Sequence, residues 1–448
     1  MGKRTFSVGG LLVSSAMVAG FFGSSITAGA TSTTYTIGVG NATPNGHDFE
    51  YVDFFPRGLP LDDSGASPTL IPDGATLDFA WNPGSPDGFH TATLLKAGTA
   101  PGPNTWGSDH PVAVPDSDDG AGKLQLNPAI LAPGPDPSCG HDVGSPCHYG
   151  GGTELNSGAQ PTATGAHYFV NISLDTSSPT TVHFVCLIHP GMQGAVTVVP
   201  ANSEASPLTP AQVSAAAAAQ YTADNTEAFA AENAANSAAV TTSADGSRTI
   251  TMTAGTASQH VEVAEMLPSQ VRVRQGDRVK WVTKTRSDIH TVTFPNGAGS
   301  NSVDPIPFVC EGTGAVDTAA NPAAGPPAFG CASPDKVENH LIPGPLGPRA
   351  ITSTSTVASS GILANAPAPF PNNFTFTFPR TGTFAYMCRI HDHMVGTVVV
   401  SAASRLAQTG RGPTSGSSPL PFGALLGGFA LLLGLGLLAT RRLSSTRR

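Results

Sequence analysis

An internal repeat divides the chain of 448 residues into two similar halves. Trp81 precedes His90 by nine residues, and Trp281 precedes His290 by the same interval. Each half later contains the pattern Cys-x-x-His-x-x-Met, whose cysteine follows the histidine by 96 residues in the first half and 98 in the second. Matched intervals in the same order are typical of a tandem duplication. The repeat therefore predicts two similar domains, and a chain of this length agrees with more than one hydrophobic core.

Each half shows the two-residue periodicity of half-buried β-strands, with turn residues between the apolar runs. Charged residues make up only 12% of the chain, and 51 glycines and 40 prolines favour short strands and turns over long surface helices. We therefore predict an all-β fold with one antiparallel β-sandwich per half. The alternating apolar positions are Leu77, Phe79 and Trp81 in the first half and Val271, Val273, Val279, Trp281, Phe374, Phe376 and Phe378 in the second.

The repeated histidine, cysteine and methionine residues have the donor types of a copper site. A cysteine and a histidine three residues apart on a loop can face one point, and a methionine three residues later adds a soft thioether. Two histidines and a cysteine with a weak axial methionine form the blue-copper electron-transfer arrangement, whereas zinc rarely uses methionine. The predicted ligands are His90, Cys186, His189 and Met192 in the first half and His290, Cys388, His391 and Met394 in the second.

These two clusters resemble those of the cupredoxin family. The Cys-x2-His-x2-Met spacing is similar to that of amicyanin rather than plastocyanin, whose interval from histidine to methionine is longer. The resemblance implies a Greek-key β-sandwich and one type 1 (blue) copper for each half. It also implies that the loop histidines, His189 and His391, lie at the protein surface, where the ring edge serves as the electron port. The matching motifs cover residues 71–96 with 181–200 and residues 271–294 with 374–400.

The chain departs from the family pattern in three ways. The interval from the first histidine to the cysteine is longer, so each half carries an insertion of several tens of residues. Thr91 and Thr291 stand where the family commonly has asparagine, although a threonine hydroxyl can still bond the ligand loop. Leu187 and Arg389 follow the cysteines, where a small or proline-flanked residue is expected. Because hydrogen bonds near the sulfur tune the potential, these departures leave the reduction potentials open.

Four further cysteines lie in the two insertions, among glycines and prolines. In an oxidising compartment, the simplest expectation is one loop-closing disulfide per insertion. A second metal site made from the first pair with His141 and His148 is the alternative, but the corresponding loop of the second half has no histidine. The predicted disulfides join Cys139 to Cys147 and Cys310 to Cys331.

Both ends of the chain have the patterns of targeting segments. Residues 1–30 combine basic residues, an apolar run and a small-residue cleavage site, which is typical of a secretory signal peptide; a permanent anchor is the alternative. Residues 419–440 are long and apolar enough to span a membrane, and the basic tail at 441–448 places the C-terminus in the cytoplasm. We expect an exported protein on the extracellular face of the membrane or wall.

The pentapeptide at residues 406–410, Leu-Ala-Gln-Thr-Gly, resembles the LAxTG signals of sortase substrates. The resemblance implies that a sortase cuts between Thr409 and Gly410 and joins the threonine to peptidoglycan. A plain membrane tail is the alternative.

Residues 201–245 are rich in alanine, and Thr209 before Pro210 is a helix-start pattern. Because large apolar residues are few, we expect one or two exposed helices that act as a spacer. The predicted organisation is a signal peptide at 1–30, cupredoxin domain 1 at 31–200, a linker at 201–245, cupredoxin domain 2 at 246–402, a sorting motif and stem at 403–418, a transmembrane segment at 419–440 and the tail at 441–448.

The charges of the two halves differ. Residues 31–200 contain 3 basic and 16 acidic residues, whereas residues 246–409 contain 12 basic and 10 acidic residues. An acidic surface makes nucleic acid an improbable partner for the first half. It favours docking of a basic redox protein on domain 1, while the basic cluster of domain 2 would face an acidic partner.

One-electron transfer is the predicted function, and an enzyme is not expected, because all ligand positions of each site are filled. A multicopper oxidase needs further His-x-His or Cys-His pairs. The only His-x-His here, at His391 and His393, already contributes to the blue site, although His393 could instead displace Met394. Copper sequestration or delivery without redox turnover remains the alternative, because the ligand set alone is compatible with it.

Overall fold

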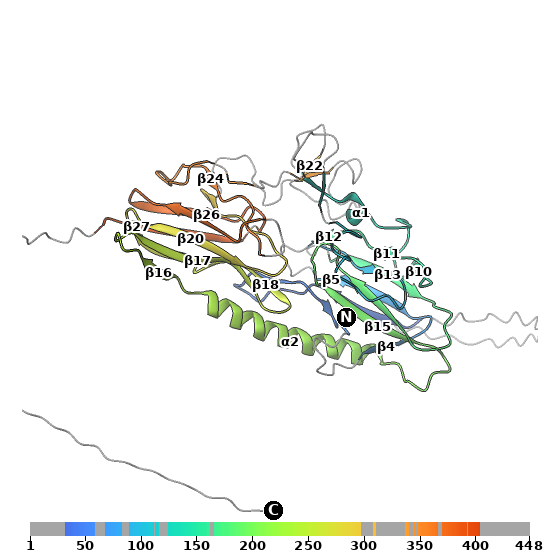
Figure 1. The fold of residues 1–448 in the computed structure, drawn as a ribbon. Helices are drawn as coiled ribbons and strands as arrows, with labels where there is room; N and C mark the ends of the chain where they lie inside the picture. The colour runs from blue at the N-terminus through green and yellow to red at the C-terminus, as the bar shows by residue number, and fades with distance from the viewer. Residues whose placement is uncertain are drawn as a thin grey trace, which may run out of the picture. The chain divides into compact units, whose positions relative to one another are not determined.

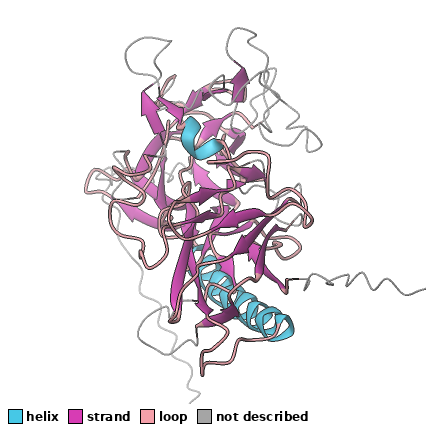
Figure 2. Ribbon diagram, turned by 90° about the vertical axis from the view of Figure 1, so that its right-hand side faces the viewer, coloured by secondary structure: helices cyan, strands magenta, loops and turns pink. Residues whose placement is uncertain are grey.

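β-Strands dominate both halves, as the alternating apolar residues predict (Figure 2). The structure, a computed structural model, describes residues 32–58, 68–82, 89–111, 113–115, 124–161, 165–296, 308–310, 337–339, 344–345, 347–365, 370–391 and 393–403. The predicted signal peptide, sortase motif and transmembrane segment lie outside these residues. No helix among the described residues is long and apolar enough to cross a membrane.

The first half folds into two five-stranded sheets whose apolar faces enclose one core (Figure 1). Leu77 and Phe79 from one sheet share this core with Val182 and Phe184 from the other. One sheet has the order β10 (Cys147–Tyr149), β13 (His167–Ile172), β5 (Thr76–Trp81), β1 (Thr34–Val39), β3 (Phe54–Phe55), and the other β11 (Leu155–Asn156), β7 (Thr93–Leu94), β14 (Thr180–Val185), β15 (Gln193–Val199), β4 (Thr69–Pro72). The smaller elements are β6 (Phe89–His90) paired with β12 (Gln160–Pro161), β8 (Ala113–Pro115) paired with β9 (Leu124–Leu126), and the short helix α1 (Pro128–Leu131).

The second half repeats this plan around an aromatic core that includes Trp281, Phe294, Phe376 and Tyr386. The sheets are mixed and not purely antiparallel as expected, because in both halves the first long strand runs parallel to its central neighbour, β1 to β5 and β17 to β20. One sheet has the order β2 (Phe49–Tyr51), β18 (Val261–Leu267), β17 (Arg248–Ala257), β20 (Arg278–Lys284), β25 (Asn373–Thr377), with β16 (Ala239–Thr242) on β17. The other has the order β19 (Gln270–Arg274), β27 (Val395–Ser401), β26 (Gly382–Met387), β21 (Thr293–Phe294), β24 (Ala358–Ser359), and β22 (Phe308–Cys310) pairs β23 (Val337–Asn339).

Strand β2 comes from the first half of the sequence but extends a sheet of the second half. It pairs antiparallel with β18, so that Glu50 stands opposite Glu262 and Tyr51 stands opposite Val261. The boundary expected at residue 200 therefore divides the sequence but does not separate the strands in space. Both halves belong to one compact unit that ends at Ala403.

The alanine-rich segment forms one long helix, α2 (Pro210–Ala235). It begins as the sequence predicts, because Thr209 and Gln212 form a capping box and Pro210 occupies the first helical position. The helix is exposed along most of its length, as expected, but it is not a free spacer. Helix α2 lies against strands of both halves, and its small residues share a core with aromatic side chains of β2 and β3 and aliphatic ones of β18 (Figure 1). That core contains Phe49, Tyr51, Phe55, Ala228, Ala235, Val261, Val263 and Leu267.

The insertion of the first half contains a disulfide between Cys139 and Cys147, as predicted. Because these cysteines are bonded to each other and both His141 and His148 are exposed, the alternative of a second metal site is contradicted. Cys331 lies outside the described residues, and with it the predicted second disulfide.

Candidate metal centres

Three donor atoms of the first half converge on one point. His90 ends β6, whereas Cys186 and His189 lie on the loop between β14 and β15. The Nδ1 atoms of the two histidines are 3.0 Å apart, and Sγ of Cys186 lies 3.9 Å from Nδ1 of His90 and 3.6 Å from that of His189. Metal–ligand bonds of about 2.0–2.3 Å allow donor atoms at such separations to meet at one ion.

The second half repeats this geometry with His290, Cys388 and His391. The Nδ1 atoms of the histidines are 3.1 Å apart, and Sγ of the cysteine lies 3.9 Å from the first and 3.7 Å from the second. All six side chains of the two clusters are buried. The structure therefore brings together the predicted histidines and cysteine of each half in closely matching arrangements.

The two predicted methionine ligands, Met192 and Met394, are buried in the same cores as the cysteines. In each half the cysteine N–H donates to the methionine carbonyl, at 3.0 Å in the first half and 2.8 Å in the second. The methionine N–H donates in turn to the carbonyl of the loop histidine. These bonds fold the loop back on itself, whereas His393, the alternative ligand, is exposed.

Threonine takes the position after the first histidine and ties the two ligand segments together in both halves. The N–H of Thr91 donates to Sγ of Cys186 at 3.4 Å, and its hydroxyl accepts from the N–H of Leu187 at 2.8 Å. Thr291 makes the same two bonds, to Cys388 at 3.3 Å and from Arg389 at 2.8 Å. The expectation that threonine can bond the ligand loop is confirmed.

In each cluster the neighbouring histidines lower the pKa of the cysteine thiol. Burial raises the pKa of the Cys186 thiol, but the hydrogen bonds and charges of His189 and His90 outweigh burial and hold the pKa well below its usual value. The same balance with His290 and His391 lowers the pKa of Cys388. Because the thiolate is the metal ligand, the protein groups alone prepare both sites for a soft metal ion.

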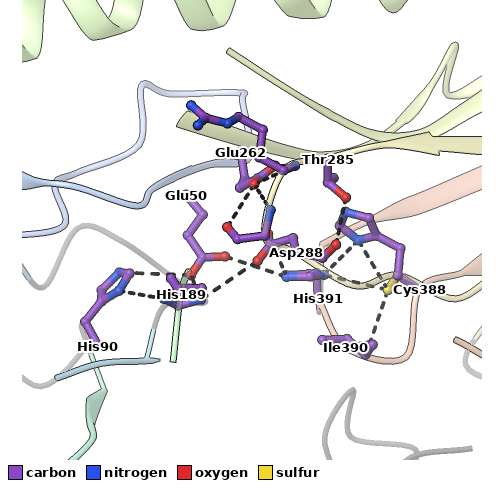
Figure 3. Close-up of polar contacts among 12 residues, drawn as sticks. Glu50, His90, His189, Glu262, Thr285, Asp288, Cys388, Ile390 and His391 are labelled. Carbon is purple, nitrogen blue, oxygen red and sulfur yellow. Dashed lines mark hydrogen bonds and ion pairs between the residues drawn. The ribbon is translucent and has the colours of Figure 1, made fainter. Parts of the chain in front are cut away.

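The loop histidines do not lie at the surface, which corrects the expectation drawn from the family. The exposed fraction is 7% for His189 and 4% for His391. Their Nε2 atoms, on the side away from the converging Nδ1 atoms, both face a pair of buried carboxylates, Glu50 and Asp288 (Figure 3). The ring edge that would meet a redox partner is thus enclosed between the two halves.

Each carboxylate spans both histidines. Glu50 places Oε1 3.4 Å from Nε2 of His189 and Oε2 3.7 Å from Nε2 of His391. Asp288 places Oδ1 3.8 Å from the first and Oδ2 3.5 Å from the second. Glu50 comes from the first half of the chain and Asp288 from the second, so each half contributes one of the two carboxylates between the sites.

The two carboxylates differ in their pKa values. Burial raises the pKa of Glu50, but its hydrogen bond with His391 and the charges of His189, His90 and His391 outweigh burial and lower it to about 2. Burial and the charge of Glu50 raise the pKa of Asp288 well above its usual value. Two neighbouring buried carboxylates are expected to diverge in this way, because each disfavours the charge of the other.

A third carboxylate, Glu262, holds the loop that carries Asp288. It accepts from the backbone N–H groups of Arg286 and Ser287 and from the hydroxyl of Ser287. The hydroxyl of Thr285 also donates to the carbonyl of Asp288, at 2.7 Å (Figure 3). These bonds fix the loop just before His290.

Sequence reasoning missed Glu50, Asp288 and Glu262. Glu50 lies in a short strand far from either motif, and only the pairing of β2 with β18 brings it to the sites. Asp288 stands two residues before His290, which was the only signal available in the sequence.

No protein-family model and no curated protein matches the chain. Among solved structures, amicyanin from Paracoccus versutus is similar with 16% identity and a TM-score of 0.16, covering 31% of this chain and 74% of amicyanin. Auracyanin from Roseiflexus castenholzii has 19% identity and a TM-score of 0.16, covering 31% of this chain and 87% of auracyanin. A mutant fern plastocyanin has 14% identity and a TM-score of 0.15, covering 31% of this chain and 89% of that protein.

Proposed function

We propose that this chain is an exported cupredoxin-type electron carrier with one type 1 copper site in each half. The observation that carries the proposal is the matched convergence of two imidazole Nδ1 atoms and one cysteine Sγ in each half. The donor set fits copper, because it joins a thiolate of lowered pKa to two imidazoles, with a buried methionine in the same core. Copper in such a site supplies reversible one-electron chemistry.

The protein groups keep the site rigid and closed. The threonine bonds and the folded ligand loop hold the donors in place, so little rearrangement is needed between oxidation states. Burial of all donor residues also leaves little room for a substrate, which favours electron transfer over catalysis.

The visible spectrum together with a copper count tests this function. We expect an intense blue oxidised protein, bleached reversibly by reductant, with two coppers per chain. The variants Cys186→Ala and Cys388→Ala should each retain one copper, and the double variant should be colourless. Colourless protein that binds and slowly exchanges copper would contradict electron transfer and support the alternative of copper sequestration or delivery.

Export, attachment and partner choice belong to the same proposal. The signal peptide and the sorting motif support a cell-wall protein joined to peptidoglycan at Thr409, and the acidic first half supports a basic redox partner. Thr409→Ala should leave the protein in the membrane fraction instead of the wall fraction. Binding to a basic partner should weaken as salt rises, and a salt-insensitive affinity would count against this surface.

A further inference from the structure

The two predicted copper sites share the environment of their loop histidines, since Glu50 and Asp288 each contact both rings. Within the described part of the chain, every ion pair of these two carboxylates runs to a histidine, and none runs to a lysine or arginine. Oδ2 of Asp288 is buried without a hydrogen-bond partner. Among the residues that the structure describes, the charge of Glu50 is therefore paired only with histidines of the two sites.

We propose that Glu50 is an electrostatic residue common to both metal sites and that it couples them. This inference rests on the proposed function. Glu50 is 5% exposed. Its carboxylate lies within 4.0 Å of Nε2 of three predicted ligands, His90, His189 and His391. A negative charge at that position favours whichever state of each site carries more positive charge.

The sign of the effect follows from charge bookkeeping. A site that accepts one electron keeps its thiolate and imidazoles, so its net charge falls by one unit. Glu50 therefore favours the oxidised state of both sites and lowers both reduction potentials. The charge that it contributes is little screened, because the carboxylate is buried between the halves.

Sharing also links the two sites to each other. When one site is oxidised, its positive charge offsets part of the field of Glu50 at the other site, which makes reduction of that second site easier. Once the first site is reduced, this favourable electrostatic effect on the second site is lost. The two reductions should consequently be spread over a wider range of potential than two independent sites would show.

Single-site proteins allow each site to be measured alone. Cys388→Ala retains the first site and Cys186→Ala retains the second, and Glu50→Gln is placed in each background. We expect Glu50→Gln to raise the midpoint potential of both single-site proteins. At a fixed potential the ratio of oxidised to reduced protein should fall roughly tenfold, which corresponds to about 59 mV for a one-electron couple. Glu50→Asp, which keeps the charge, should restore much of the difference.

The matched control is Asp78→Asn. Asp78 is also a buried carboxylate of the first half, but it pairs with His167 instead of a predicted ligand. The substitution Asp78→Asn should leave the midpoint potentials of both single-site proteins unchanged. If both single-site proteins are blue but Glu50→Gln shifts the midpoint potential in only one of them, or in neither, Glu50 is not shared by the two sites. Single-site proteins without blue copper would instead overturn the proposed function itself.

A second measurement needs no change at Glu50. The redox titration of the unaltered protein is compared with the sum of the titrations of the two single-site proteins. A broader curve than the sum supports coupling, and an identical curve contradicts it. This comparison remains decisive if Glu50→Gln fails to fold.

Discussion

At the scale of single residues, each candidate metal site has one threonine that bonds two segments carrying predicted ligands. Thr91 and Thr291 each bond the cysteine sulfur through the backbone and the residue after the cysteine through the hydroxyl. The repeated pair of bonds shows how a threonine at this position attaches the cysteine loop in both halves.

Removing one of these hydroxyls should affect one half only. Thr91→Val leaves the buried N–H of Leu187 without its acceptor, so we expect a loss of about 1–3 kcal/mol in the free energy of unfolding. Urea unfolding measures the loss, and the visible spectrum of the Cys388→Ala protein reports the change at the first site. Thr91→Ser retains the hydroxyl and should behave like the unaltered protein; an equal loss in Thr91→Ser would show that the bond is not the cause.

Gly255 in β17 makes room for a ligand. A Cβ at this position would lie 2.1 Å from Nε2 of His290, and the backbone has a φ of +73°. We therefore expect Gly255→Ala to displace the imidazole and lower the copper content from two ions to one per chain. Gly246→Ala is the control, because Gly246 has a φ of +81° but nothing within 4 Å of its Cβ position. Two coppers bound to Gly255→Ala would contradict the prediction.

At the scale of elements, helix α2 is attached through a buried ionic cluster. Arg57, from the segment after β3, donates to both carboxylate oxygens of Asp224 on the helix at 2.8 Å and also pairs with Asp53. The amide of Gln220 donates to Asp53 and to the carbonyl of Phe54. This cluster joins the helix to the first half at a position that its alanines could not have indicated.

Arg57→Ala should loosen the helix, because it leaves two buried carboxylates without their cation. We expect the free energy of unfolding to fall by about 3–5 kcal/mol. Arg248→Ala should cost less, because Arg248 is more exposed than Arg57 and its partner Asp277 keeps a hydrogen bond from the N–H of Arg274. Urea unfolding compares the two variants, and hydrogen exchange of the α2 amides locates the change; similar losses in both would refute the role of the cluster.

The parts of the fold that could be predicted from sequence are those set by local order. The cysteine, histidine and methionine of each loop lie within seven residues, and the N-cap at Thr209 depends on its immediate neighbours. The docking of α2 was not predicted, because its packed face holds few large apolar residues, chiefly Val213, Tyr221 and Phe229, and gains its other apolar partners from distant strands. The pairing of β2 with β18 was equally hidden, since β2 has three residues and pairs with a strand more than 200 residues away.

At the scale of the whole molecule, the same long-range pairing explains why the two sites face each other. The repeat alone predicts two separate domains, and the resemblance to cupredoxins implies an electron port in solvent for each. Strand β2 carries Glu50 into the sheet of the second half, and α2 covers the junction beside it. Both halves thus belong to one compact unit, in which Nε2 of each loop histidine faces a carboxylate of the other half.

This interlocking predicts that the halves unfold together. Unfolding either half would expose the core shared by Phe49, Tyr51 and Val263, so the other half would lose part of its own packing. Copper bound to the first site of the Cys388→Ala protein stabilises the native state by RT ln(1 + [L]/Kd), about 2.7 kcal/mol at 100-fold excess over Kd. We expect calorimetry of this protein to show one transition that moves as a whole to higher temperature with copper, while the Cys186→Ala, Cys388→Ala double variant stays in place. Two transitions, of which only one responds to copper, would mean that the halves unfold independently.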